Sequence, residues 1–225
     1  MTEFLISPFA LFEELGARIY WLYLLSAITL AVVLFVFNDR SEEGRSLVEY
    51  GLPFKVIFHR SAINDYVFFY ANFLFQGAFV TVYFSSLSVV VSDTVLRSLG
   101  ESFPNLQASF STDEVFVGIC LTVFLAAVAD FAVFIGHYLQ HKVAWLWEFH
   151  KVHHSAEVMT PMTVFRMHPV DNILTFSLAG FFSGTALGCV LFLSGGAFDF
   201  YNVAGTNLLL IAFYIFGYNL RHSHV

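Results

Sequence analysis

Five long apolar stretches constrain the fold of this chain more than any other feature of its sequence. They cover Ile19–Phe37, Tyr66–Val91, Val115–Gly136, Ile173–Leu193 and Asn202–Tyr218. A helix needs about 20 residues to cross the hydrocarbon core of a bilayer. The stretches also lack the alternation that is typical of transmembrane barrel strands. We therefore predict an all-α, polytopic integral membrane protein with about five transmembrane helices, of which the last, containing Asn207, is the shortest.

The composition argues against several other classes of protein. Hydrophobic residues make up 58% of the 225 residues and charged residues only 12%, whereas soluble domains carry about 25% charged residues. This balance disfavours both a soluble enzyme and a disordered chain. The net charge of −7, without a basic stripe, predicts no nucleic-acid partner. Cys120 and Cys189 lie inside apolar stretches, and we expect them to be inert buried thiols.

The basic residues predict how the chain is oriented in the membrane. Eight of the ten fall in loops on one side of the predicted helices, and Arg18 and Arg97 fall on the other. The eight are Arg40, Arg45, Lys55, Arg60, Lys142, Lys151, Arg166 and Arg221. Because Lys and Arg concentrate on the cytoplasmic side, we place the N-terminus outside and the C-terminus in the cytoplasm. No linker divides the chain, so we treat residues 1–225 as a single membrane domain, with 92–114 as an external loop.

The histidines concentrate on the predicted cytoplasmic side, although they were not used to set the orientation. His137 and His141 are four residues apart, a spacing that places both side chains on one face of a helix, about 5–6 Å apart. Five histidines within eighteen residues favour a shared metal site over a solvated loop that happens to be rich in histidine. The nine are His59, His137, His141, His150, His153, His154, His168, His222 and His224.

Clustered imidazoles without thiolates narrow the choice of metal. They suit Zn, Cu, Fe or Ni, and the lack of cysteine argues against a structural zinc knuckle. So many nitrogen ligands in one segment suggest more than one metal ion. A histidine that binds a metal usually has its other ring nitrogen hydrogen-bonded to a carboxylate or carbonyl. The carboxylates nearby in the sequence are Glu148, Glu157 and Asp171.

Asp130 is the one acid well inside an apolar stretch. It lies seven residues before His137, which places it about 10 Å deeper along the same helix face. Ionisable groups at such depth are costly and often functional, so Asp130 is a candidate to support a metal ligand or to line a pocket beneath the metals. The alternative is a polar contact that holds this helix against a neighbouring one.

Three stretches of the sequence match motifs that occur together in one known family. Asp130-Phe131, Phe134 and His137 through His141 are similar to the pattern D-F-x-x-(aromatic)-x-x-H-x-x-x-H. Residues 146–157, LWEFHKVHHSAE, are similar to L-W-x-F-H-x-V-H-H-S-x-E, and residues 163–169, TVFRMHP, to T-x-x-R-x-H-P. Together they resemble the fatty acid hydroxylase and sterol desaturase superfamily of membrane non-haem di-iron oxidases, with residues 130–169 as the histidine-box core of the resemblance. The upstream half looks like bacterial members, so we expect a bacterial sterol desaturase family protein.

The resemblance implies an oxidoreductase that uses O2 and two iron ions to hydroxylate or desaturate a C–H bond of a sterol, fatty acyl or related lipid. The lipid would enter from the bilayer, and electrons would come from a separate ferredoxin or cytochrome b5-type donor. The membrane would be the bacterial inner membrane, or the endoplasmic reticulum in a eukaryote, with the histidines cytoplasmic. The implied metal ligands are His137, His141, His150, His153, His154 and His222. Further ligands, or hydrogen-bond partners of ligands, would be His168, His224, Asp130 and Glu157.

One departure from the family pattern affects the expected activity. Family members continue to a last H-x-x-H-H box, whereas this sequence ends at Val225. We expect a C-terminally truncated member; the alternative is a non-catalytic member with an incomplete metal site. A divalent-metal transporter is the rival from another class. It would need polar ligands in the middle of at least two helices, where the sequence offers only Asp130, with Asn72, Gln76 and Asn207 as weaker groups.

Overall fold

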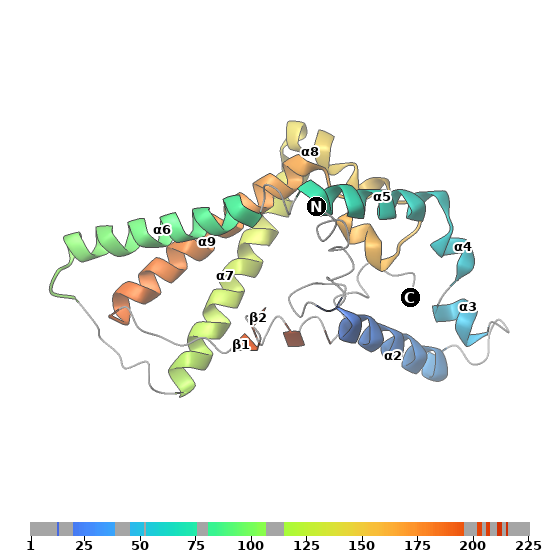
Figure 1. Ribbon diagram of the computed structural model, residues 1–225, viewed down its shortest axis with the longest axis horizontal. Coiled ribbons are helices and arrows are strands. Elements are labelled where there is room, and N and C mark those ends of the chain that lie inside the picture. Colours follow the sequence, from blue (N-terminus) through green and yellow to red (C-terminus); the bar gives the residue numbers. More distant parts are fainter. Residues whose placement is uncertain are drawn as a thin grey trace.

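The fold is helical in nearly all of the chain that the computed structural model describes (Figure 1), which confirms the all-α prediction. The described residues are 13, 20–38, 46–51, 53–75, 81–106, 115–195, 202–203, 206–207, 211–212 and 215. The α-helices are α2 (Trp21–Asn38), α3 (Leu47–Gly51), α4 (Phe54–Ile57), α5 (Arg60–Phe75), α6 (Thr81–Ser102), α7 (Val115–Lys142), α8 (Ala144–His150) and α9 (Pro169–Leu193). Two 3-10 helices, η2 (His153–Ser155) and η3 (Pro161–Phe165), and two short strands, β1 (Asn202–Val203) and β2 (Thr206–Asn207), complete the list.

Helix α9 packs closely against α6, and Figure 1 shows the two lying side by side. A Cβ atom at Gly184 would lie 2.6 Å from the Ser88 carbonyl oxygen, and one at Gly188 would lie 2.6 Å from the Ser92 carbonyl oxygen. Small residues at this spacing let two helix backbones approach each other directly. Because both pairs advance together along the chain, α6 and α9 run in the same direction.

Helix α7 packs on α9 in the opposite direction. Near the C-terminal end of α7, the Gln140 side chain donates to the Asp171 carbonyl oxygen at 3.2 Å. Nine residues earlier, the Phe131 ring meets the Phe182 ring edge-on, with 5.9 Å between centroids. The C-terminal end of α7 therefore lies beside the N-terminal end of α9. The segment 143–168, which holds α8, η2 and η3, connects these two ends (Figure 1).

Helix α5 fixes this connecting segment from the side. The buried Asn72 amide donates to the carbonyl oxygens of Phe165 at 2.9 Å and Met167 at 2.8 Å, and its own oxygen accepts from Asn172 at 3.1 Å. The sequence suggested Asn72 only as a weak metal ligand in a transporter. Its donors and acceptor instead link α5 to the start of α9 and to the chain just before it.

Two of the described helices are long and apolar enough to cross a membrane. They are Gly118–Lys142 within α7 and Pro169–Leu193, and a shorter apolar helix covers Trp21–Phe37. Large apolar side chains such as Phe124, Phe131 and Phe134 are exposed on α7. Apolar side chains on a lipid-facing surface would be exposed in this way, because the hydrocarbon of the bilayer shields them from water as the protein interior would. Cys120 is also exposed, so its predicted burial is wrong; Cys189 is half-buried.

Three boundaries predicted from the sequence are corrected. The stretch Tyr66–Val91 is divided between α5, which ends at Phe75, and α6, which begins at Thr81. The predicted loop 92–114 is helical as far as Ser102, because α6 continues to pack along α9 and Asp93 pairs with Arg97 one turn on, at 2.9 Å.

The third correction concerns the predicted span Asn202–Tyr218. Asn202 pairs with Asn207 and Val203 with Thr206 in an antiparallel ladder. Asn and Thr are weak helix formers, which explains why a helix does not begin here. Most of the rest of this span lies outside the described residues.

Candidate metal centre

Four histidine side chains converge where α7, α8 and η2 meet. They are His137, His141, His150 and His154, and each offers one ring nitrogen within 4.8 Å of the others. The Nε2 atom of His141 lies 3.1 Å from Nε2 of His137 and 3.2 Å from Nε2 of His154. Two nitrogen ligands bound about 2.1 Å from one metal ion are about 3.0–3.4 Å apart. The spacing of these nitrogens therefore fits ligation of a single ion.

The five histidines between positions 137 and 154 form two groups, and the local backbone structure differs between the groups. His137 and His141 share one face of α7, as their spacing predicted. His150 ends α8, and a new 3-10 helix begins at His153, so the second group is not on one helix as the first is. The turn between them nevertheless brings His154 beside His150 and His141, with ring centroids 5.0 and 4.7 Å apart.

His150 is the most informative member of the group. Its side chain is fully buried, and within the described part of the chain neither ring nitrogen has a hydrogen-bond partner. Its Nδ1 atom lies 3.6 Å from Oδ2 of Asp171, which is also fully buried, and the other Asp171 oxygen has no partner either. Leaving a buried polar group unsatisfied costs about 1–3 kcal/mol. A metal ion on one nitrogen of His150, with a carboxylate beside the other, would satisfy the group, and this arrangement is typical of metal-binding histidines.

The electrostatics around His154 favour its neutral imidazole form. The pKa of His154 is lowered from its usual value, first by burial and then by the neighbouring His150 and His141. Protonation is opposed because a charged ring loses solvation and is repelled by the rings around it. Neutral imidazole is the form that binds metal, so the protein holds His154 ready for ligation near neutral pH.

His153 lies beside the four-histidine group without joining it. Its Nδ1 atom lies 3.2 Å from the Arg166 carbonyl oxygen. Because a carbonyl oxygen only accepts hydrogen bonds, Nδ1 carries the proton in this contact; in the neutral ring the lone pair is then on Nε2. The ring centroid of His153 is 5.6 Å from that of His150 and 5.3 Å from that of His154.

A pocket of about 550 Å³ adjoins the histidines. Its lining residues are Asp130, Val133, Phe134, His137, His153, His154, Ala156, Met159 and Thr163. The first four lie on one face of α7, and the others come from the segment after α8. Asp130 is exposed at this pocket, and it has no hydrogen bond or ion pair with another described residue. Its position favours the pocket over the helix-packing interpretation.

Other residues named from the sequence lie outside the group. His168 caps α9: its Nδ1 accepts from the Val170 backbone at 3.2 Å, while the Asp171 carboxylate accepts from the His168 backbone at 3.3 Å. Glu157 is largely exposed, 3.9 Å from His59. Glu148 is also exposed and pairs with Lys151. His222 and His224 lie outside the described residues.

The sequence did not point to a buried ion pair between Asp65 and Arg166. Their side chains are 2.5 Å apart at Oδ1 and Nε, with Asp65 fully buried and Arg166 nearly so. Asp65 lies immediately before the apolar stretch that begins at Tyr66, and Arg166 was interpreted as a loop charge and as one position of a family motif. The one available signal was the arginine in the TVFRMHP segment.

Comparison with known proteins identifies the part of the chain that carries this site. Residues 122–224 match the family model described as fatty acid hydroxylase. This part of the chain, a little under half of its length, is similar to the fatty acid hydroxylase family. Its bounds include all four converging histidines, Asp171 and the pocket residues, and the resemblance read from the motifs is confirmed. Comparison with curated proteins and with solved structures gave no match.

The family match indicates which general kind of chemistry the site supports. A fatty acid hydroxylase domain with a histidine group able to bind metal indicates an oxidoreductase-type enzyme. The two long apolar helices and the membrane-associated family together indicate a membrane protein.

Proposed function

We propose that this protein is a membrane-bound, non-haem di-iron oxidoreductase that uses O2 to hydroxylate or desaturate a C–H bond of a lipid. The observation that carries the proposal is the buried His150, whose ring nitrogens lack partners among the described residues while three other imidazoles approach it. Such a group is costly unless a hydrogen bond, an ion pair or a metal ion satisfies it, and a metal ion would be reached by all four imidazoles at once. The fatty acid hydroxylase match supports redox chemistry at that metal.

The residues present fit a metal of this kind. His137, His141, His150 and His154 would hold one ion, and Asp171 would orient His150. Iron supplies the oxidising power for cleaving an unactivated C–H bond, which zinc lacks because it has no redox chemistry. A second ion needs further ligands. His153, beside the group, and His222, outside the described residues, are the proposed ones, with His224 a further candidate.

The pocket suits the hydrocarbon part of a lipid. Val133, Phe134 and Met159 offer apolar contact to a chain that reaches His137 and His154. Asp130 places one hydrogen-bond acceptor in the same pocket, where it would fix the position of a donor group on the substrate. The lining residues on α7 lie within the apolar helix Gly118–Lys142, so a lipid would enter sideways from the bilayer.

The membrane location and the electron donor are part of the same proposal. We place the protein as a multi-pass protein with its histidines at the cytoplasmic face, in the bacterial inner membrane or, in a eukaryote, in the endoplasmic reticulum. Electrons would come from a separate ferredoxin or cytochrome b5-type donor. Which lipid is oxidised, and at which carbon, is a question for product analysis.

The proposal is tested by iron content and by the fate of oxygen atoms from O2. The chain and its His150→Ala variant are purified from iron-supplied cells, with His59→Ala as the matched control because His59 lies outside the four-histidine group. We expect iron in the wild type and in His59→Ala, and little in His150→Ala. Cells grown under ¹⁸O2 should yield a labelled hydroxylipid, or a newly desaturated lipid, only with the wild type and the control.

The possible outcomes separate the alternatives. Iron that His150→Ala leaves unchanged would overturn the metal assignment. Iron that depends on His150, without any lipid product, would favour the non-catalytic family member with an incomplete metal site. Zinc in place of iron, retained under iron-rich growth, would contradict an oxidase.

A further inference from the structure

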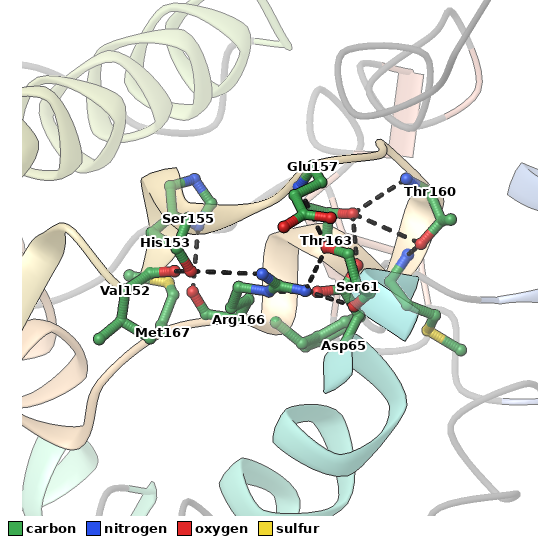
Figure 2. Close-up of polar contacts among 12 residues, drawn as sticks. Ser61, Asp65, Val152, His153, Ser155, Glu157, Thr160, Thr163, Arg166 and Met167 are labelled. Carbon is green, nitrogen blue, oxygen red and sulfur yellow. Dashed lines mark hydrogen bonds and ion pairs between the residues drawn. The ribbon is translucent and has the colours of Figure 1, made fainter. Parts of the chain in front are cut away.

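The Arg166 side chain joins two parts of the molecule that lie far apart in the sequence. Its Nε donates to Asp65 at 2.5 Å, and its Nη2 donates to the Ser61 hydroxyl at 2.9 Å and to the Ser61 carbonyl oxygen. Its Nη1 donates to the Ser155 hydroxyl at 3.3 Å. Figure 2 shows Arg166 between the start of α5, which carries Ser61 and Asp65, and the η2 turn, which carries His153 and Ser155.

Asp65 holds the η3 helix at a second point. Its Oδ2 atom accepts from the Thr163 hydroxyl at 2.7 Å, while Oδ1 accepts from Arg166. The Thr163 hydroxyl also accepts from the Thr160 backbone at 2.9 Å, which caps η3. One buried carboxylate therefore fixes both the cap and the C-terminal end of η3 on α5. Thr163 in turn lines the pocket beside the histidines.

The same arginine reaches His153 by two routes. Its carbonyl oxygen lies 3.2 Å from His153 Nδ1, and its guanidinium holds Ser155, two residues further along the same turn. The first contact sets which ring nitrogen of His153 is protonated, and the second fixes the turn on which His153 and His154 lie. In Figure 2, the second ring nitrogen of His153 points away from Arg166.

We propose that Asp65 and Arg166 are positioning residues for the histidine site. They hold His153, which lines the same pocket as His137 and His154, in its Nδ1-protonated form. This inference rests on the proposed function in one respect, namely that Nε2 of His153 binds a metal ion. A buried ion pair is weak evidence for stability. Among the described residues, every hydrogen bond of the Arg166 guanidinium goes either to α5 or to the histidine-bearing turn.

The first test measures metal affinity in a double-mutant cycle. Metal-free protein in nanodiscs is titrated with Co²⁺, followed by visible absorption, for the wild type, Asp65→Asn, His153→Ala and the double variant. We expect Asp65→Asn to weaken binding about 10–100-fold, the usual cost of losing a supporting residue. In the His153→Ala background the same change should have little further effect, because coupled residues are not additive. Full additivity would overturn the proposal.

The second test reads the His153 ring without metal. Protein with ¹⁵N-labelled histidine is studied by NMR, and the His153 signals are assigned as those missing from His153→Ala. We expect the Nδ1-protonated form in the wild type and a shift towards the Nε2-protonated form in Asp65→Asn. An unchanged tautomer would contradict the positioning role. If the wild type binds no Co²⁺, the proposed function fails, and this second measurement still decides the role of Asp65.

Two further variants distinguish a positioning role of Asp65 from a general loss of structure in Asp65→Asn. Asp93→Asn removes a carboxylate from an exposed ion pair on α6 and should change neither measurement. Ser155→Ala removes only the hydroxyl that accepts from Arg166, at an exposed position. If Asp65→Asn does not fold, Ser155→Ala decides: we expect a weaker shift of the His153 tautomer in the same direction, and no shift would overturn the proposal.

Discussion

At the scale of single residues, the site depends on groups that are buried in pairs. His150 and Asp171 are each fully buried and lie 3.6 Å apart. Water cannot satisfy either side chain, so each depends on the other and on whatever binds the remaining nitrogen of His150. In the sequence, Glu148, Glu157 and Asp171 are the carboxylates near the histidines, and the family resemblance named only Glu157 as a candidate site residue. Burial beside a histidine distinguishes Asp171, because the two glutamates are exposed.

Asp171→Asn tests whether the carboxylate charge supports His150. Asparagine keeps a side-chain oxygen that can accept from the His168 backbone, so this contact is kept while the charge is lost. We expect metal affinity to fall about 10–100-fold, measured by Co²⁺ titration of metal-free protein. Glu148→Gln, an exposed change near the same histidines, should leave the affinity unchanged. Equal affinities for Asp171→Asn and the wild type would contradict the orienting role.

Asp130→Asn separates the two interpretations of the acid in α7. Because Asp130 lines the pocket without joining the four-histidine group, we expect lipid oxidation to fall more than iron content. Product formation and iron per chain are measured on the same preparation. A variant that does not accumulate in the membrane would instead support the helix-packing interpretation.

At the scale of elements, close helix packing gives the site its scaffold. Helix α9 lies between α6 and α7, and glycines on its α6 side leave no room for a Cβ atom. The N-terminal end of the same helix carries Asp171 and the His168 cap. A displacement of α9 would therefore move Asp171 relative to His150, so packing far from the histidines still affects them.

Gly188→Ala tests this packing, with Gly100→Ala as the matched control. A Cβ at Gly188 would lie 2.6 Å from backbone, whereas one at Gly100 meets nothing within 4 Å. We expect Gly188→Ala to destabilise the protein by about 1–3 kcal/mol. Gly100→Ala should be neutral or stabilising by up to about 1 kcal/mol, because alanine favours the helix. Unfolding is followed by circular dichroism in detergent. Equal effects would show that α6 and α9 do not pack this closely.

At the scale of the whole molecule, the helix directions separate Arg97 from the histidines. Helices α6 and α9 run in parallel, and α9 begins beside the histidines. Arg97, near the C-terminal end of α6, is therefore directed away from the histidine end. The prediction of five spans, and of a cytoplasmic histidine face, still requires an experiment in a membrane.

Cysteine labelling provides that experiment. His59→Cys and Arg97→Cys are made in a background without Cys120 and Cys189, and intact cells are treated with a membrane-impermeant thiol reagent. We expect labelling of Arg97→Cys from outside and of His59→Cys only after the membrane is opened, because positive loops stay in the cytoplasm. Labelling of both from one side would overturn the orientation.

The sequence by itself determined the helical class, the family and the histidine pairing on α7. Each of these depends on local pattern: apolar length, motif spacing and the period of 3.6 residues per turn. The tertiary structure decided what depends on contacts between distant segments. It separated His153 from the four converging histidines, buried Asp171 beside His150, and joined Asp65 to Arg166 across about a hundred positions. It also extended α6 to Ser102, because packing on α9 stabilises a segment whose composition alone resembled a loop.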